Sequence, residues 1–131
     1  MTRQWVQTYT GHALYYDRVD ENVYSIADIA HALSNQCRFS GHTGTFYSVA
    51  EHSVLCSYLV PVEYALEALL HDASEAYLVD IPKPLKYLLP DYCAIEDQVM
   101  RAIANVFTIQ YPFHEEIKRA DIAMLYAERD V

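Results

Sequence analysis

Glycine and basic residues are both scarce in this chain of 131 residues. The three glycines, Gly11, Gly41 and Gly44, all lie in the first third, and no repeat, low-complexity tract or linker divides the sequence. A single domain over residues 1–131 is therefore expected. The 9 Lys and Arg against 18 Asp and Glu leave a formal net charge of −9. A protein that binds a nucleic-acid polymer needs a basic stripe, so no such partner is expected.

Cysteines and long hydrophobic runs are also few. Cys37, Cys56 and Cys93 are scattered and lack CxxC spacing, which argues against a disulfide framework or a thiolate zinc site and fits a reducing cytoplasm. The apolar runs are too short to span a bilayer, and "MTRQWVQTYTG" lacks the apolar segment of a signal peptide. We therefore expect a cytoplasmic protein with no membrane partner. Hydrophobic residues still make up 53% of the chain, enough for a packed core.

An irregular, β-prone arm over residues 1–25 precedes a series of helical segments. The expected helix starts are two N-cap serines, two prolines and one aspartate: Ser25, Ser48, Pro61, Asp91 and Pro112. The third helix is expected to continue through residue 78, and "IPKPLKYLLP" after it predicts a bent loop with one helical turn. The chain is therefore predicted to be all-α, a compact bundle of about five to six helices with a short irregular or hairpin arm.

Three of the expected helices carry a polar residue on their apolar face. The first helix is expected to bury Ile26, Ile29, Ala30 and Leu33. The polar residues and their same-face neighbours are His52 with Val49, Cys56 and Leu59, Asp72 with Ala65, Leu69 and Ala76, and Asp121 with Ile117, Met124 and Leu125. His71 is about 100° from Asp72 around the helix and flanks the same point. Polar side chains of three helices are therefore predicted to point inward.

Buried aspartates without partners would be very costly, and a divalent cation would satisfy the whole set. Imidazole nitrogens and carboxylate oxygens are ligands for zinc, manganese, cobalt, nickel or iron. A cation would also offset the repulsion that this acidic chain exerts on an anionic substrate. A single inward histidine is usually only a hydrogen-bonded core residue. Four such residues on three converging faces favour a metal site.

The order His52, His71-Asp72 and Asp121 resembles the signature of the HD-domain superfamily of metal-dependent phosphohydrolases. The stretches that carry the resemblance are "TYTG", "DIAHALSNQCRFSGHTGTFYSVAEHSV", "ALLHDASEAYLVDIPKPLK" and "IKRADIAMLYAERD". Within that superfamily they are similar to bacterial 5′-deoxynucleotidases and phage dATP triphosphohydrolases. The resemblance implies a compact HD-domain helical bundle and one divalent metal ion (Zn, Mn, Co, Ni, Fe or Mg) held by these four residues.

The same resemblance assigns further roles. Arg38, which precedes the first ligand by 14 residues, would contact phosphate or substrate, and Glu75 and Asp80 would be catalytic. Phe39 stands where related deoxynucleotidases have tryptophan, so base or sugar selectivity is expected to differ. Each residue also has a plain structural reading. Glu75 would belong to a solvated helix surface, Asp80 would cap a turn, and Arg38 would form a surface ion pair.

Other residues near the expected site are candidates for substrate binding. Lys83 and Lys86 flank Pro84 and would reach one polyphosphate, although exposed lysines usually belong to the solvated surface. His42 lies in "SGHTG", where it would contact substrate or be an ordinary loop histidine. Phe39 and Tyr77 are the candidates for base stacking, while most of the twelve tyrosines are expected in the core and in subunit contacts.

The leading functional expectation is a metal-dependent phosphohydrolase that acts on the phosphate ester or anhydride of a (deoxy)nucleotide, a dNMP or a dNTP such as dATP. Relatives of this kind run on past "AERD" and assemble as dimers or rings, whereas this chain stops at Val131. Either the chain is a truncated or minimal version of such a protein, or a partner subunit covers the open side, and a homo-oligomer is expected. One alternative is a non-catalytic nucleotide- or metal-binding module. Another is a di-iron oxygenase, which would need further histidine ligands, but residues 73–113 contain no histidine.

Overall fold

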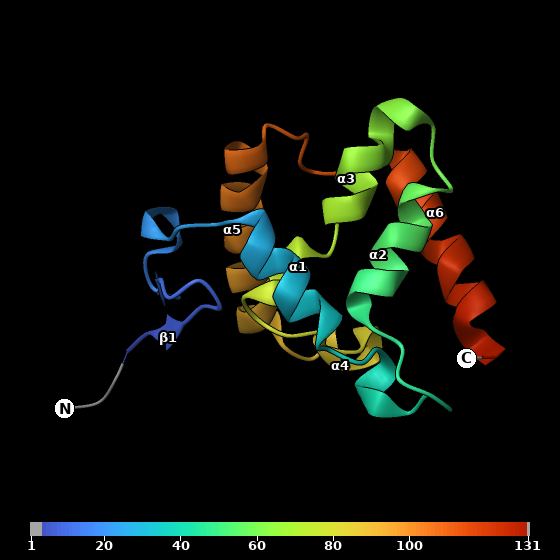
Figure 1. Ribbon diagram of the computed structural model, residues 1–131, viewed down its shortest axis with the longest axis horizontal. Helices are drawn as coiled ribbons and strands as arrows, with labels where there is room; N and C mark the ends of the chain where they lie inside the picture. Colours follow the sequence, from blue (N-terminus) through green and yellow to red (C-terminus); the bar gives the residue numbers. More distant parts are fainter. Residues whose placement is uncertain (1–3, 131) are drawn as a thin grey trace.

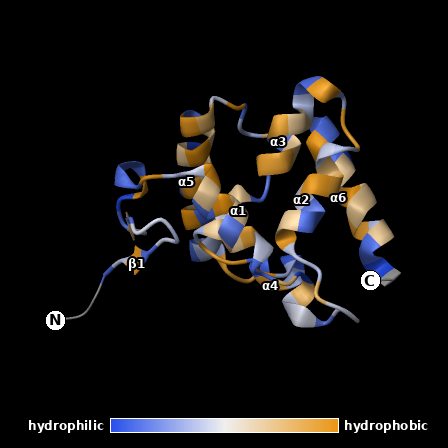
Figure 2. Ribbon diagram, in the orientation of Figure 1, coloured by the Kyte–Doolittle hydropathy of each residue, from blue (hydrophilic) through white to orange (hydrophobic). Residues whose placement is uncertain are grey.

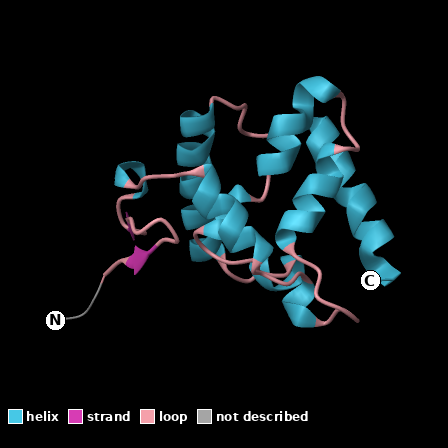
Figure 3. Cartoon of the chain, viewed as in Figure 1, coloured by secondary structure: helices cyan, strands magenta, loops and turns pink. Residues whose placement is uncertain are grey.

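The computed structural model describes residues 4–130, which form six α-helices and one small hairpin (Figures 1 and 3). In the hairpin, β1 (Val6–Gln7) pairs antiparallel with β2 (Ala13–Leu14). The helices are α1 (Ile26–Ser34), α2 (Val49–Ser57), α3 (Ala65–Leu70), α4 (Lys83–Lys86), α5 (Pro90–Phe107) and α6 (Glu115–Ala127). Short 3-10 turns are η1 (Val19–Glu21), η2 (Phe39–Gly41), η3 (Val62–Tyr64), η4 (Ala73–Ala76) and η5 (Glu128–Asp130). The expected all-α class with a short N-terminal arm is confirmed.

Residues 1–3 of the expected arm and Val131 lie outside the described residues. Within the described part, no helix combines the length and the apolar character needed to cross a membrane.

Two groups of helices make up the fold. The first group, α1, η4 and α5, packs around a core that includes Leu33, Val99 and Ile103. In the second group, α2 packs against α3 and α6, on the side of the molecule away from the arm (Figure 1). Figure 2 shows hydrophobic and hydrophilic residues interleaved along α2 and α6. On α2 the buried side itself carries His52 and Ser53, while Val54 and Leu55 are exposed.

The helix starts at Ser25 and Ser48 are confirmed. The Ser25 hydroxyl accepts the Asp28 N–H at 3.2 Å, and the Ser48 hydroxyl accepts the Glu51 N–H at 3.0 Å. Each serine thus satisfies a backbone donor that has no partner within the first turn of its helix. The expected long helix begins at Pro90, one residue before Asp91, and the bent loop holds its single helical turn in α4.

The expected third helix through residue 78 is wrong. Its α-helical part ends at Leu70, and the chain continues through His71 and Asp72 into the 3-10 turn η4. Asp72 has φ −104° and ψ 14°, outside regular helical geometry. The tighter winding of η4 lets Ala73, Ser74 and Glu75 all be buried, which a continuous helix with one packed face would not do.

Four further details of the expected helices are corrected. The last helix begins at Glu115 rather than Pro112, because the His114 imidazole accepts the Glu116 N–H and caps it there. Of the four α1 residues expected in the core, only Ile29 and Leu33 are buried, while Ile26 is 53% exposed and Ala30 is also exposed, because the helix packs along a narrow stripe. Leu125 is 45% exposed, since the packed side of α6 runs through its buried residues, Ile117, Ala120 and Met124. Leu59 is also exposed, beyond the end of α2.

Candidate metal centre

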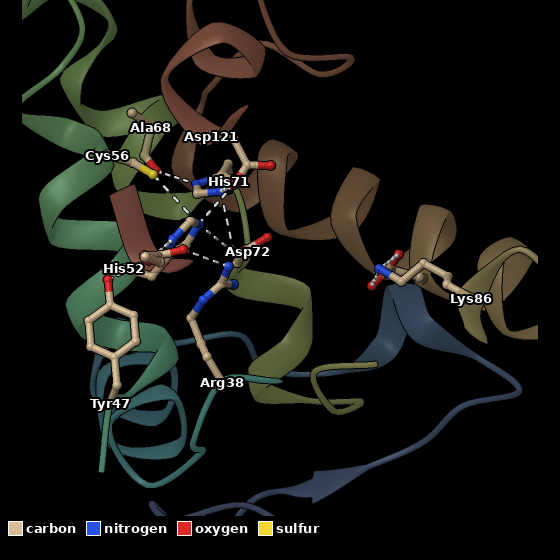
Figure 4. A network of polar contacts seen from close by, with 11 residues as sticks. Arg38, Tyr47, His52, Cys56, Ala68, His71, Asp72, Lys86 and Asp121 are labelled. Carbon is tan, nitrogen blue, oxygen red and sulfur yellow. Dashed lines mark hydrogen bonds and ion pairs between the residues drawn. The ribbon is translucent and has the colours of Figure 1, made fainter. Parts of the chain in front are cut away.

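Side chains from three helical segments converge where α2, α3 and α6 meet (Figure 4). His52 comes from α2, His71 from the end of α3 and Asp121 from α6. The Asp121 Oδ1 atom lies 2.8 Å from His52 Nε2 and 3.3 Å from His71 Nε2. Two imidazole nitrogens thus face one carboxylate oxygen, although the three residues are far apart in sequence.

Asp72 joins the same cluster. Its Oδ2 atom lies 3.3 Å from His71 Nε2 and 3.5 Å from His52 Nε2. The chain leaves regular helical geometry at Asp72, and both side chains still reach the point that the sequence predicts them to flank. The structure therefore brings together all four residues that the sequence predicted as ligands.

Cys56 is a fifth member of the cluster, and sequence reasoning missed it. Its Sγ atom lies 3.5 Å from His52 Nε2. The possible ligand atoms of His52, Cys56, His71 and Asp121 all lie within 4.8 Å of one another. The sequence analysis had counted Cys56 only as an apolar neighbour of His52. The available signal was its position four residues after His52, which places both side chains on one helix face.

Both imidazoles are oriented by hydrogen bonds of their other nitrogen. His71 Nδ1 donates to the Ala68 carbonyl at 2.6 Å, and His52 Nδ1 donates to Glu128 Oε2 at 2.7 Å. In each ring Nε2 then faces the cluster. Such outer partners fix the tautomer and orientation of metal-binding histidines.

Glu128 is the second residue that sequence reasoning missed. It is buried, and its carboxylate also accepts a hydrogen bond from the Tyr47 hydroxyl and one from Arg38 Nη2 at 3.0 Å. It lies seven residues after Asp121, two helical turns along the same face, and this spacing was the available signal. Glu128 thereby joins the end of α6 to α2 and to the segment that precedes α2.

Burial, hydrogen bonds and neighbouring charges shift the pKa values of His52, His71 and Asp121. Burial by itself would lower the pKa of His52, but its hydrogen bonds with Asp121, Cys56 and Glu128 raise that pKa to about 11. Burial likewise opposes protonation of His71, yet the charge of Asp72 leaves the pKa of His71 raised. Burial would raise the pKa of Asp121, and the bonds from the two imidazoles lower it instead. Without metal, the centre therefore holds protons that a cation would displace.

Glu75 lies beside Asp72 with one carboxyl oxygen unsatisfied. Its side chain is buried, and no residue of the described chain hydrogen-bonds its Oε1 atom. Burial, followed by the charges of Asp72 and Asp80, raises the pKa of Glu75 well above the ordinary value. Gln36, also missed from the sequence, donates to the Glu75 carbonyl at 2.9 Å and accepts the Asp80 N–H at 3.1 Å. Gln36 thus holds the Glu75 and Asp80 segments next to each other.

A cleft of about 350 Å³ opens beside the cluster. Its walls include Asp72 and Asp121 together with six of the residues predicted for catalysis or substrate contact, Arg38, Phe39, Glu75, Asp80, Lys83 and Lys86. Leu125, expected in the core, lines this cleft instead.

The basic residues of the cleft differ in whether an acidic residue already pairs with them. Arg38 Nη2 is bound to Glu128, its Nε–H has no partner among the described residues, and its guanidinium lies 4.7 Å from the centre of the Phe39 ring. Lys86 pairs with Glu96 at 3.1 Å, whereas Lys83 is exposed. The cleft therefore offers one fixed guanidinium and one exposed ammonium group.

His42 and Tyr77 are not where the sequence analysis expected them to act. His42 lines a neighbouring hollow with Phe39, Glu128 and Arg129 rather than the cleft itself. Tyr77 is buried, and its ring packs edge-on against Tyr24, so the proposal that it stacks on a base is wrong. Its burial follows from the 3-10 turn of η4, which directs it into the core.

The other histidines have local partners. His12 bonds to Thr10, His31 stacks on Tyr9, and His114 caps α6 and stacks on Tyr64. Among the described residues, the metal-capable cluster therefore contains only two of the six histidines. This gives no support to a di-iron site, which would need more imidazoles than the cluster holds.

Comparison with known proteins places the chain in a family. No model of a protein family matches it. It is 49% identical over 125 residues to the uncharacterized protein YfdR of Escherichia coli (strain K12), an alignment that covers 95% of this chain and 70% of YfdR. It is 35% identical to an uncharacterized protein of Rhodobacter capsulatus over 92% of this chain and 66% of that protein. At this identity and coverage, the chain belongs to the family of the Escherichia coli protein YfdR.

Proposed function

We propose that the chain is a metal-dependent phosphohydrolase of the HD-domain type, which hydrolyses the phosphate ester or anhydride of a (deoxy)nucleotide. One observation carries the proposal. Two imidazoles and two carboxylates converge at a cleft whose wall also holds a guanidinium, an unsatisfied buried carboxyl and a lysine. This combination suits an anionic substrate, and a predominantly acidic protein would otherwise repel such a substrate.

The donor set fits a divalent metal ion. Nitrogen and oxygen donors from His52, His71, Asp72 and Asp121 lie close together, and outer hydrogen bonds already orient both imidazoles. These residues would hold the ion. A bound divalent cation would polarise a phosphoryl oxygen and neutralise charge that develops in the transition state.

The chain's own residues supply the remaining chemistry. The Arg38 guanidinium, fixed by Glu128, would bind phosphoryl oxygens through its free donors. Lys83 would bind the outer phosphates of a polyphosphate. Glu75 would orient the attacking water and, in its ionised form, accept the proton that this water loses, since a carboxyl with a raised pKa serves as a base near neutral pH. Asp80, at the wall of the same cleft, would act on the leaving oxygen or the sugar.

Turnover of a nucleotide panel tests this proposal. Protein with verified metal content would be incubated with each (d)NMP and (d)NTP and with Mn²⁺, Co²⁺ or Zn²⁺. Release of phosphate, pyrophosphate or triphosphate would be measured. His71→Ala should abolish both metal retention and turnover, whereas His31→Ala, which changes a histidine outside the cluster, should retain both. Absence of turnover with every metal would contradict the proposal, and tight binding of an intact nucleotide would instead favour a non-catalytic binding module.

A further inference from the structure

We propose that Cys56 is a direct donor to the metal, so that the centre is a mixed nitrogen, sulfur and oxygen site selective for zinc-like ions. The inference rests on the metal centre of the proposed function and narrows the choice of metal. It also revises the expectation, drawn from cysteine spacing, that no thiolate takes part. Three features of Cys56 support this role, namely its distance from His52, its direction and its burial.

The distance between Cys56 and His52 matches two ligands of one ion. Zinc binds thiolate sulfur at about 2.3 Å and imidazole nitrogen at about 2.0–2.1 Å in tetrahedral geometry. Two such bonds at the tetrahedral angle place sulfur and nitrogen roughly 3.5 Å apart. The separation of Cys56 Sγ from His52 Nε2 is 3.5 Å. The two atoms therefore already have the spacing that a shared zinc ion would impose.

The direction of the sulfur is toward the centre rather than into an apolar core. Cys56 Sγ contacts the one nitrogen of His52 that faces His71 and Asp121, and these four donors form a mutually close set. Position i+4 on α2 places the thiol and the imidazole one turn apart on the same face. In the view of Figure 4 the sulfur lies on one side of the two imidazoles and Asp72 on the other.

The Cys56 thiol is fully buried beside the other possible ligands. Cys56 has no exposed surface, so bulk water does not compete for its sulfur. A buried cysteine is often only a small hydrophobic residue. Here, however, its sulfur contacts a ring nitrogen that the fold holds toward other ligands. On metal binding the thiol would lose its proton and the thiolate would coordinate the ion.

Three donors of the centre would bind any of these ions, and two more donors differ in their chemistry. His52, His71 and Asp121 are shared, Cys56 offers a soft sulfur, and Asp72 offers a hard oxygen. Thiolate ligands select zinc and similar ions, whereas manganese and magnesium prefer oxygen. Removal of Cys56 should therefore weaken Zn²⁺ and Co²⁺ binding while leaving Mn²⁺ binding unchanged.

Cobalt spectroscopy on single-residue variants tests the assignment. Metal-free protein would be titrated with Co²⁺, and the thiolate-to-cobalt charge-transfer absorption in the near ultraviolet would be recorded. We expect this band in the wild type and in Cys37→Ser/Cys93→Ser, which retains only Cys56, and its loss in Cys56→Ser. Zinc affinity of Cys56→Ser should fall at least about 10- to 100-fold, the usual effect of losing even an outer partner of a ligand. A band that survives in Cys56→Ser would overturn the assignment.

X-ray absorption of the zinc-loaded wild type provides a measurement that does not depend on a variant folding. One sulfur at about 2.3 Å, beside nitrogen or oxygen neighbours, is expected. A shell of nitrogen and oxygen alone would overturn the role of Cys56. If such a protein still hydrolyses nucleotides, the proposed function stands and only this inference fails. If zinc is bound to sulfur but the protein hydrolyses no nucleotide, this inference stands and the proposed function fails.

Discussion

Replacement of Glu128 tests most directly whether the hydrogen bonds behind the candidate metal centre hold it in place. This buried carboxylate has three donors around it, His52 Nδ1, the Tyr47 hydroxyl and Arg38 Nη2. Burial by itself would raise the pKa of Glu128, but hydrogen bonds from His52 and Tyr47 and the nearby positive charges lower it, so the group is an anion at neutral pH. Through these bonds Glu128, in the turn η5 that follows α6, is linked to α2 and to the segment before α2.

The size of the effect follows from what the substitution leaves behind. Glu128→Ala leaves the nearly buried Arg38 guanidinium and the Nδ1–H group of the fully buried His52 without their acceptor, although Asp121 remains beside His52 Nε2. Removal of one partner of a buried ion pair costs about 3–5 kcal/mol. In a domain of this size such a loss lowers the melting temperature by roughly 10 °C or more. Glu128→Gln keeps the volume but turns an amide NH₂ toward one of the donors, and it no longer holds the His52 ring firmly.

The assay combines stability and metal binding. Denaturant unfolding of metal-free protein gives the free energy of unfolding, and competition with a chelator gives zinc affinity. We expect Glu128→Gln to lose about 10- to 100-fold in zinc affinity, because outer hydrogen bonds orient metal-binding imidazoles. Glu115→Gln is the matched control, since Glu115 is an exposed carboxylate on α6 whose pair with Arg119 contributes at most about 1 kcal/mol. Equal stability and zinc affinity in the two variants would refute the supporting role of Glu128.

Three further predictions concern acidity, catalysis and substrate. A pKa of His52 raised from 6.5 to about 11 stabilises the metal-free fold fully below pH 6.5, and this stabilisation is lost as pH rises toward 11. In the presence of a chelator, the denaturant concentration at the unfolding midpoint should therefore fall as the pH rises from 7 to 11. A midpoint that does not change with pH would contradict the hydrogen bonds of His52. Glu75→Gln should retain stoichiometric metal and lose about 10²- to 10⁴-fold in kcat, and full activity would remove Glu75 from the mechanism. Lys83→Ala should raise KM roughly tenfold for a triphosphate, the loss of one charge-assisted hydrogen bond, but leave a monophosphate unaffected, and equal effects would exclude a contact with outer phosphates.

Local periodicity in the sequence determines much of the fold. The N-caps at Ser25 and Ser48 and the long helix to Phe107 needed only short-range patterns, because capping and amphipathic spacing depend on neighbours within a few residues. The inward direction of His52 followed from the same spacing, and the side chain is fully buried. Periodicity was less reliable for Ile26 and Leu125, since a helix face that carries apolar residues is buried only where another element covers it.

Contacts between distant segments decided the rest. Periodicity predicted a continuous helix through His71 and Asp72, whereas α3 ends at Leu70 and both side chains still meet at one point. Cys56 was visible only as an apolar position until His71 and Asp121 were placed beside it, and Glu128 gained its role through partners 76 and 90 residues away. A residue's identity and helical phase predict which way it points. What it meets there depends on how the helices pack, and that is set by the burial of the whole chain rather than by any short stretch of it.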